Sequence, residues 1–159
     1  MARARLRSRA FARAALVLLV VVGLDQLAKH TIAASVPEGE THKFLPLIDL
    51  VHVRNTGVAF GFFSGGGALV LGLTMLALVA LIAYLALRPE RPLLWLPTGM
   101  LVGGAVGNLI DRVSTGSVID FIKLPHWPAF NVADMSITFG VLALLYVLEG
   151  RPDHEPAEH

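Results

Sequence analysis

The chain has 159 residues, of which 55% are hydrophobic and only 16% are charged, and its formal net charge is +1. Soluble domains usually carry about a quarter charged residues, so this composition indicates a membrane protein. The absence of cysteine excludes disulfides, thiolate metal sites and cysteine nucleophiles. We expect a single domain, residues 1–159, whose core is shared between lipid and protein.

Four apolar stretches predict four transmembrane helices, at residues 11–34, 65–87, 93–111 and 131–149. The second stretch contains no charged residue. At about 1.5 Å rise per residue it can cross a hydrocarbon layer of roughly 30 Å. The first qualifies if Asp25 and Lys29 are accepted inside it, and the fourth has Asp134 near its start. The expected fold class is an all-α membrane protein with four transmembrane helices.

Arginines gather on one side of these stretches, before the first, between the second and third, and after the fourth. They are Arg3, Arg5, Arg7, Arg9, Arg13, Arg88, Arg91 and Arg151. By the positive-inside tendency both termini are expected in the cytoplasm, which leaves segments 35–64 and 112–130 outside. A cleaved signal peptide is the alternative interpretation of the arginine-rich start. Asp25 and Lys29 argue against it, because they interrupt the region where a cleavage site belongs.

The first outer segment predicts a small β-rich extracytoplasmic subdomain. It contains "HKFLPLIDLVHVRNTGVAFGFF", in which short β-branched and aromatic runs are separated by turn-forming residues. With the opening of the second outer segment, it is expected to form a small curved sheet over the site. Asn55 followed by Gly57 suggests backbone placed close to a ligand. Four aromatic residues are expected at the lipid interface or against acyl chains: Phe60, Phe62, Phe63 and Trp127.

The topology brings polar residues of three expected helices to one level near the outer face. They are Asp25, Lys29, Asn108, Asp111, Arg112, Asn131 and Asp134. Asp25 and Lys29 are four residues apart and therefore face the same way. An ionisable group in the membrane costs roughly 2.5–3.5 kcal/mol even on lenient scales, so the cluster indicates a functional site. Helix-packing hydrogen bonds are the alternative interpretation.

Acids without a thiol suggest an aspartyl hydrolase. Two carboxylates held close together cannot both ionise cheaply, so one keeps a proton while the other is charged. One can then act as general base on a water molecule and the other as general acid on a carbonyl oxygen. Asp120 and Asp134 are the expected pair, because the interval between them carries Pro125 and Pro128 and can fold back.

Four segments of the chain carry a resemblance to a known family. They are "DQLAK" at 25–29, "RNTGVAFG" at 54–61, "GGAVGNLIDRVSTGSVIDFI" at 103–122 and "FNVAD" at 130–134. With these segments, the chain resembles the lipoprotein signal peptidase (signal peptidase II) family over almost its whole length. The resemblance implies an aspartyl endopeptidase of the bacterial cytoplasmic (inner) membrane. Its implied substrates are diacylglyceryl-modified prolipoproteins, cut just before the lipidated cysteine.

The resemblance also implies roles for individual residues. It puts the catalytic aspartates at Asp120 and Asp134, and the supporting polar residues at Asp25, Lys29, Asn55, Asn108, Arg112 and Asn131. The amides can hydrogen-bond the pair without adding charge, and Arg112 can hold a carboxylate or a lipid phosphate. Asp25 with Lys29 is expected to tie the first helix to the outer domain. Asp111 is interpreted as a salt-bridge or helix-end residue.

Neither a metal nor another cofactor is expected, because the histidines are scattered without ligand spacing. The expected partners are prolipoprotein substrates and membrane lipids, without nucleic acid, and a monomer is the default. A small transporter is the main rival function, but its polar residues would be distributed through the membrane. A non-catalytic membrane scaffold is a second rival, and it would tolerate Asp120→Asn and Asp134→Asn.

Overall fold

The computed structural model describes residues 1–56 and 66–150, apart from the side chains of residues 66–71. In chain order the elements are α1 (Ala2–Ser35), β1 (Thr41–Leu45), β2 (Ile48–Asn55), α2 (Gly66–Leu87), α3 (Trp95–Thr115), β3 (Val118–Lys123) and α4 (Val132–Glu149). All four expected helices are present, together with the expected small sheet. The protein is therefore mostly helical, with its strands inserted between the helices.

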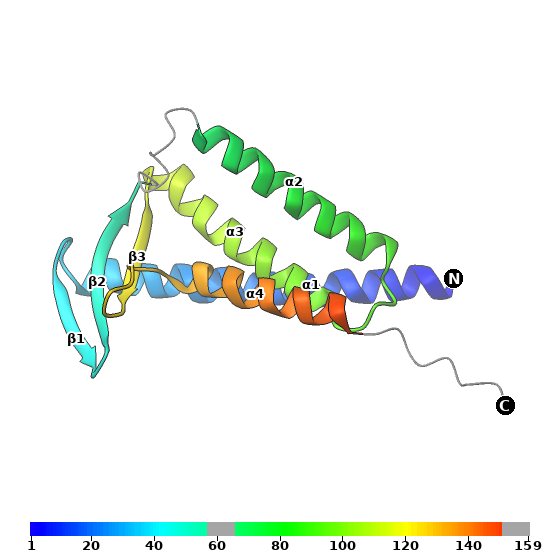
Figure 1. Cartoon of the computed structure of the whole chain (residues 1–159), viewed down its shortest axis with the longest axis horizontal. Helices are drawn as coiled ribbons and strands as arrows, with labels where there is room; N and C mark the ends of the chain where they lie inside the picture. Colours follow the sequence, from blue (N-terminus) through cyan, green and yellow to red (C-terminus); the bar gives the residue numbers. More distant parts are fainter. Residues whose placement is uncertain (57–65, 151–159) are drawn as a thin grey trace.

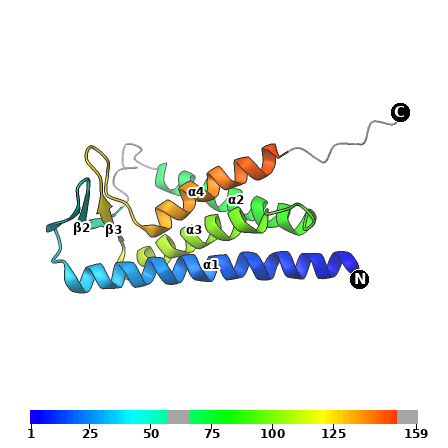
Figure 2. The same ribbon diagram turned by 90° about the horizontal axis from the view of Figure 1, so that it is seen from below.

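The helices run along the long axis of the molecule, and the sheet closes one end (Figure 1). The start of α1 and the end of α4 lie at the opposite end, as the expected topology requires. α1, α3 and α4 lie alongside one another in the view from below (Figure 2). The sheet consequently covers the end of α1 and the beginning of α4.

Glycines on α3 allow this close packing. A Cβ added to Gly99 would lie 2.6 Å from the backbone oxygen of Ala14 on α1. A Cβ added to Gly104 would lie 2.6 Å from the backbone oxygen of Ala133 on α4. No larger side chain fits at either distance, so the small residues of α3 bring both neighbouring backbones into contact, as close packing in lipid predicts.

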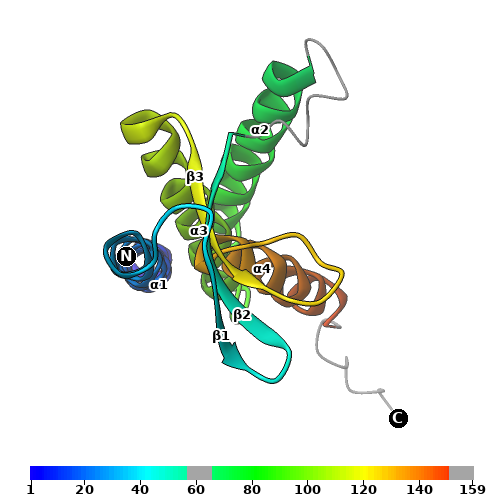
Figure 3. The same cartoon turned by 90° about the vertical axis from the view of Figure 1, so that its left-hand side faces the viewer.

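The three strands form an antiparallel sheet in the order β1-β2-β3. Seen from the sheet end, it lies across the helices (Figure 3). The register of β2 against β3 pairs Val53 with Asp120 and Asn55 with Val118. Since side chains alternate along a strand, this register sets Asn55 beside the strand position that carries Asp120.

Two helix boundaries differ from the prediction by more than two residues. α1 begins at Ala2, not at residue 11, because its arginines and alanines favour helix and extend it beyond the apolar stretch. α3 continues to Thr115, past residue 111, and stops where Gly116 takes a left-handed conformation with φ of 77°. Arg112, which the prediction placed in the outer segment, is therefore a helical residue.

Among the residues that the structure describes, α1 and α4 are long and apolar enough to cross a membrane, and a shorter apolar helical stretch covers Gly72–Leu87. Four helices are thus observed, while the number of spans remains a prediction.

Candidate active site

Asp120 and Asp134 come from the sheet and from a helix and meet at Asn131. Asp120 lies in the middle of β3 with 3% of its surface exposed, and Asp134 lies in the first turn of α4, partly exposed. The side-chain amide of Asn131 donates to Asp120 Oδ1 at 2.7 Å, and its oxygen accepts the backbone N–H of Asp134 at 2.9 Å. One buried amide therefore holds both expected catalytic residues.

The position of Asn131 follows from helix capping. Asn131 precedes α4 in an extended conformation, and its side chain accepts the N–H of Asp134. The Asp134 carboxylate accepts the backbone N–H of Asn131 in return, at 3.2 Å between N and Oδ2. This reciprocal capping box satisfies two backbone donors at the start of the helix. The same bonds that begin α4 also fix the orientation of Asp134.

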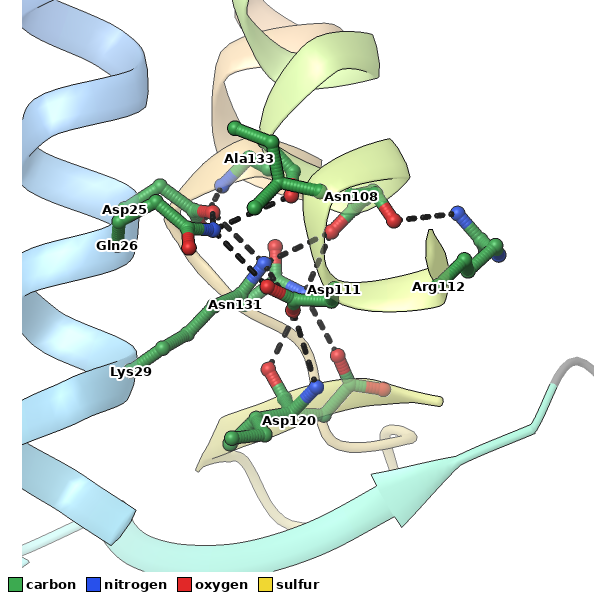
Figure 4. A network of polar contacts seen from close by, with 12 residues as sticks. Asp25, Gln26, Lys29, Asn108, Asp111, Arg112, Asp120, Asn131 and Ala133 are labelled. Atoms are coloured by element: carbon green, nitrogen blue, oxygen red, sulfur yellow. Dashed lines mark hydrogen bonds and ion pairs between the residues drawn. The ribbon is translucent and has the colours of Figure 1, made fainter. Parts of the chain in front are cut away.

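Asn108 on α3 connects the carboxylate of Asp134 to the buried side chains of Lys29 and Asn131. Its amide nitrogen donates to Asp134 Oδ1 at 2.8 Å. Its oxygen accepts from Lys29 Nζ at 3.0 Å and from the Asn131 amide at 3.2 Å. Asn108 is 6% exposed, so its donors and acceptor are oriented by protein groups. Figure 4 shows this network between α1, α3 and β3.

Asn55, at the end of β2, supports Asp120 from the opposite side to Asn131. Its amide donates to Asp120 Oδ2 at 3.0 Å, so each oxygen of that carboxylate accepts from an amide. Burial raises the pKa of Asp120 above its ordinary value, and the charge of Asp134 raises it further. The hydrogen bonds of Asn55 and Asn131 and the more distant charge of Lys29 act in the opposite direction. The net direction is upward, which favours a carboxyl group that retains its proton.

Asp25, Lys29 and Asp111 form a buried charged triad next to the amides of Asn108 and Asn131 (Figure 4). Lys29 Nζ lies 2.7 Å from Asp25 Oδ2 and 2.8 Å from Asp111 Oδ2. The salt bridge expected of Asp111 is therefore confirmed. Asp25 accepts the backbone N–H of Ala133 at 2.9 Å, and Asp111 accepts that of Ile119 at 3.3 Å. The triad thus ties α1 to α3, to the start of α4 and to β3.

The remaining expected site residues lie outside this buried network or outside the described residues. Arg112 is exposed, and its guanidinium donates to the backbone oxygen of Asn108 at 3.2 Å. No ion pair of the described residues involves Arg112, so the structure does not show it holding a carboxylate. Gly57, and the aromatic residues Phe60, Phe62 and Phe63, lie outside the described residues. Trp127 is 61% exposed, which suits the expected interfacial position.

Sequence reasoning missed Gln26. Its amide nitrogen lies 2.9 Å from Asp111 Oδ1 and 3.2 Å from the backbone oxygen of Gly107. Gln26 follows Asp25 directly, so the four-residue spacing of Asp25 and Lys29 did not include it. The available signal was an amide side chain next to Asp25 in the apolar stretch of α1.

The arrangement suits acid–base chemistry on a polar bond. Two carboxyl groups lie in one hydrogen-bonded unit, one of them buried with a raised pKa and the other partly open to its surroundings. A single proton shared between such groups makes one an acid and the other a base. Neutral amides orient both groups without neutralising either.

Comparison with known proteins identifies the family. The sequence pattern of the family described as Signal peptidase (SPase) II matches residues 17–149. The chain belongs to the signal peptidase II family. The lipoprotein signal peptidase of Moorella thermoacetica is 42% identical over 149 residues, which cover 89% of this chain and 97% of the relative. That of Syntrophomonas wolfei is 39% identical over 142 residues, which cover 87% and 95%.

A solved structure described as a bacterial membrane enzyme determined by the in meso method at 1.9 Å agrees with the fold of this signal peptidase II. The two superpose with a TM-score of 0.75 at 32% identity, covering 87% of this chain and 94% of the solved one. The matched range of the family contains every residue of the site, from Asp25 to Asp134. The family resemblance and the membrane character expected from the sequence are therefore confirmed.

Proposed function

We propose that Asp120 and Asp134 are the catalytic pair with which this signal peptidase II removes signal peptides from prolipoproteins. The observation that carries the proposal is the shared amide of Asn131, which bonds the side chain of Asp120 and the backbone of Asp134. If Asn131 only capped α4, a second buried amide would not be needed, yet Asn108 donates to Oδ1 of Asp134, the carboxylate oxygen that the capping box does not use. Buried amides thus hold both carboxyl groups in fixed orientations, which supports their acting as a pair.

The roles of the two acids follow from their surroundings. Burial and the neighbouring charge raise the pKa of Asp120, so we assign to Asp120 the proton of the resting pair. Asp134 is then the general base. It removes a proton from a water molecule, whose oxygen attacks the scissile carbonyl, while Asp120 donates its proton to the carbonyl oxygen.

The tetrahedral intermediate collapses by returning these protons. Asp134 gives its new proton to the leaving nitrogen, and Asp120 takes back the proton of the intermediate's hydroxyl group as the carbonyl reforms. The C–N bond breaks, and each acid regains its original protonation state. The substrate-binding or supporting residues that we propose are Asp25, Lys29, Asn55, Gly57, Asn108, Arg112 and Asn131.

We further propose that the substrate is a diacylglyceryl-modified prolipoprotein cut just before its lipidated cysteine. The four helices would span the bacterial cytoplasmic membrane as a monomer, with both termini in the cytoplasm and the site at the outer leaflet. The distribution of arginines supports this orientation, because the arginine-rich start of α1 and the link between α2 and α3 lie at the end opposite the sheet. The apolar exposed faces of the helices support contact with lipid.

Cleavage of a synthetic precursor by the purified full chain tests the assignment. Asp120→Asn and Asp134→Asn are each expected to lower kcat at least about a hundredfold, since general acid–base groups contribute roughly 10²–10⁴. Asp49→Asn, on β2 of the same sheet, is the matched control and should retain activity. Diacylated and unmodified precursors are compared side by side. Normal cleavage by both dyad variants would refute the pair, and equal rates on the two precursors would refute the lipid requirement.

A further inference from the structure

A cavity lies at the end of the molecule that is farthest from the sheet. It has a volume of about 200 Å³, is open on one side, and is bordered by the start of α1, the link between α2 and α3, and the first residue of α3. From α1 it is lined by Leu6, Arg9, Ala10 and Arg13, which share one helix face at intervals of three and four. The peptidase site makes no use of this cavity.

The charge that lines the cavity is mostly positive. Arg9 and Arg13 are both exposed and lie four residues apart on α1, a spacing at which like charges repel. The guanidinium of Arg13 stacks over the ring of Trp95 at 5.7 Å, which holds it beside the cavity. Glu90 is the one carboxylate lining the cavity in the described part of the chain, and its recorded ion pair is with Arg88, at 4.0 Å. An anion between the two arginines would relieve their repulsion.

The wall opposite α1 is fixed in place. Arg91, in the link, donates to the backbone oxygens of Val147 and Leu148 at the end of α4, at 3.0 and 2.9 Å from Nη2. Its Nη1 donates to the hydroxyl of Tyr84 on α2 at 2.9 Å. These bonds hold the link against two helices, so the cavity is preformed and Arg91 itself is committed to the fold.

We propose that this cavity binds the phosphate group of an anionic phospholipid. A guanidinium presents paired donors that match phosphate oxygens, and basic pockets between helices at the cytoplasmic side of membranes bind anionic headgroups. A lipid is favoured over free phosphate because apolar residues flank the arginines. Leu6 is 45% exposed and Leu93 is 48% exposed, and both line the cavity, where acyl chains would cover them. The inference goes beyond the peptidase function and does not depend on the catalytic pair.

Native mass spectrometry of the full chain in detergent tests the proposal, with palmitoyl-oleoyl phosphatidylglycerol and the matched phosphatidylcholine as probes. The wild type is expected to bind phosphatidylglycerol more tightly. Arg9→Gln combined with Arg13→Gln should weaken that binding by about tenfold or more, since each arginine near an anionic lipid contributes about a fivefold factor. The matched control is Arg3→Gln with Arg7→Gln, which removes the same charge at the same four-residue spacing on α1 from residues that do not line the cavity. Circular dichroism establishes that each variant is folded.

The outcomes separate the possible sources of binding. Loss confined to the cavity variant supports the site. An equal loss of phosphatidylglycerol binding in both double variants would show a diffuse attraction to positive charge and would overturn the proposed site. A wild type that does not prefer phosphatidylglycerol to phosphatidylcholine would also overturn it. Inorganic phosphate is added in a separate arm. If it binds with millimolar or better affinity and phosphatidylglycerol fails to compete, the ligand is free phosphate and the lipid assignment is wrong.

Discussion

Lys29 offers the sharpest test of how the site is held together. Its ammonium group bonds Asp25, Asp111 and Asn108 at 2.7, 2.8 and 3.0 Å, so each of its three protons has an acceptor. Asp25 is fully buried and Asp111 is 6% exposed. Replacing Lys29 with methionine keeps the length of the side chain and removes its charge. Two carboxylates would then remain in the interior without a cation.

The expected cost follows from this burial. Removing one partner of a buried ion pair destabilises a protein by about 3–5 kcal/mol, because the remaining charge is uncompensated. For a chain of this size that corresponds to a fall in unfolding temperature of roughly 6–20 °C. Thermal unfolding of the purified chain in detergent measures it. Lys43→Met, an exposed lysine of β1, is the matched control and should change the unfolding temperature little.

A second variant separates the loss of charge balance from the loss of packing. Lys29→Met combined with Asp25→Asn and Asp111→Asn removes the whole triad and leaves neutral groups of similar shape. Uncompensated buried charge accounts for most of the cost of the single variant, so removing the two carboxylate charges as well should restore much of the lost stability. An unfolding temperature for Lys29→Met within about 2 °C of the wild type would refute the reasoning. So would a triple variant that is no more stable than the single one.

Three further predictions concern the carboxyl pair and the helix contacts. Asn55→Ala removes a hydrogen-bond donor that favours the ionised form of Asp120, so the pKa of Asp120 should rise further. Because Asp120 is the assigned acid, the alkaline limb of the plot of kcat/KM against pH should then move to higher pH. Movement to lower pH would contradict the assigned roles. Asp120→Asn should unfold at an equal or higher temperature than the wild type at neutral pH. Because the pKa of Asp120 is raised on folding, the wild type loses stability as pH rises from the ordinary pKa to the folded one, so the difference should vanish in acid below the ordinary pKa. Gly104→Ala would place a Cβ 2.6 Å from the backbone oxygen of Ala133, and it should lower the free energy of unfolding by about 1–3 kcal/mol. Gly23→Ala is the control and should not destabilise the chain, because its Cβ would meet nothing within 4 Å.

Much of the architecture could be predicted because lipid-facing helices have a simple sequence signal. Predominantly apolar stretches located all four helices, and the four-residue spacing of Asp25 and Lys29 predicted that they face the same way, which agrees with the ion pair that the structure shows between them. The ends of α1 and α3 were harder to predict. Hydropathy marks where lipid is expected, whereas hydrogen bonding and helix propensity decide where a helix ends.

The contacts between elements could not be obtained from spacing alone. Asn55 reaches Asp120 through the register of β2 on β3, and both strands are short enough to pair in more than one way. Gln26 and the backbone N–H of Ala133 join the network only because glycines on α3 let the helices approach closely. Such distances depend on the packed structure, and no local pattern of residues encodes them.

The order of charged and neutral groups in the site has a physical reason. A cation bonded directly to the carboxyl pair would favour ionisation of both acids and remove the proton that one of them needs. In the structure Lys29 is compensated by two other carboxylates, and it reaches Asp134 only through the neutral amide of Asn108. The triad can therefore hold the helices together, while the neutral amides orient the carboxyl groups of the pair without placing a cation against them. We infer that Asn108→Asp, which would place a further acid between Lys29 and the pair, should cost more activity than Asn108→Ala, although aspartate is the closer match in shape. The reverse order in kcat/KM on a lipid-modified precursor would show that charge separation is not what the amides provide.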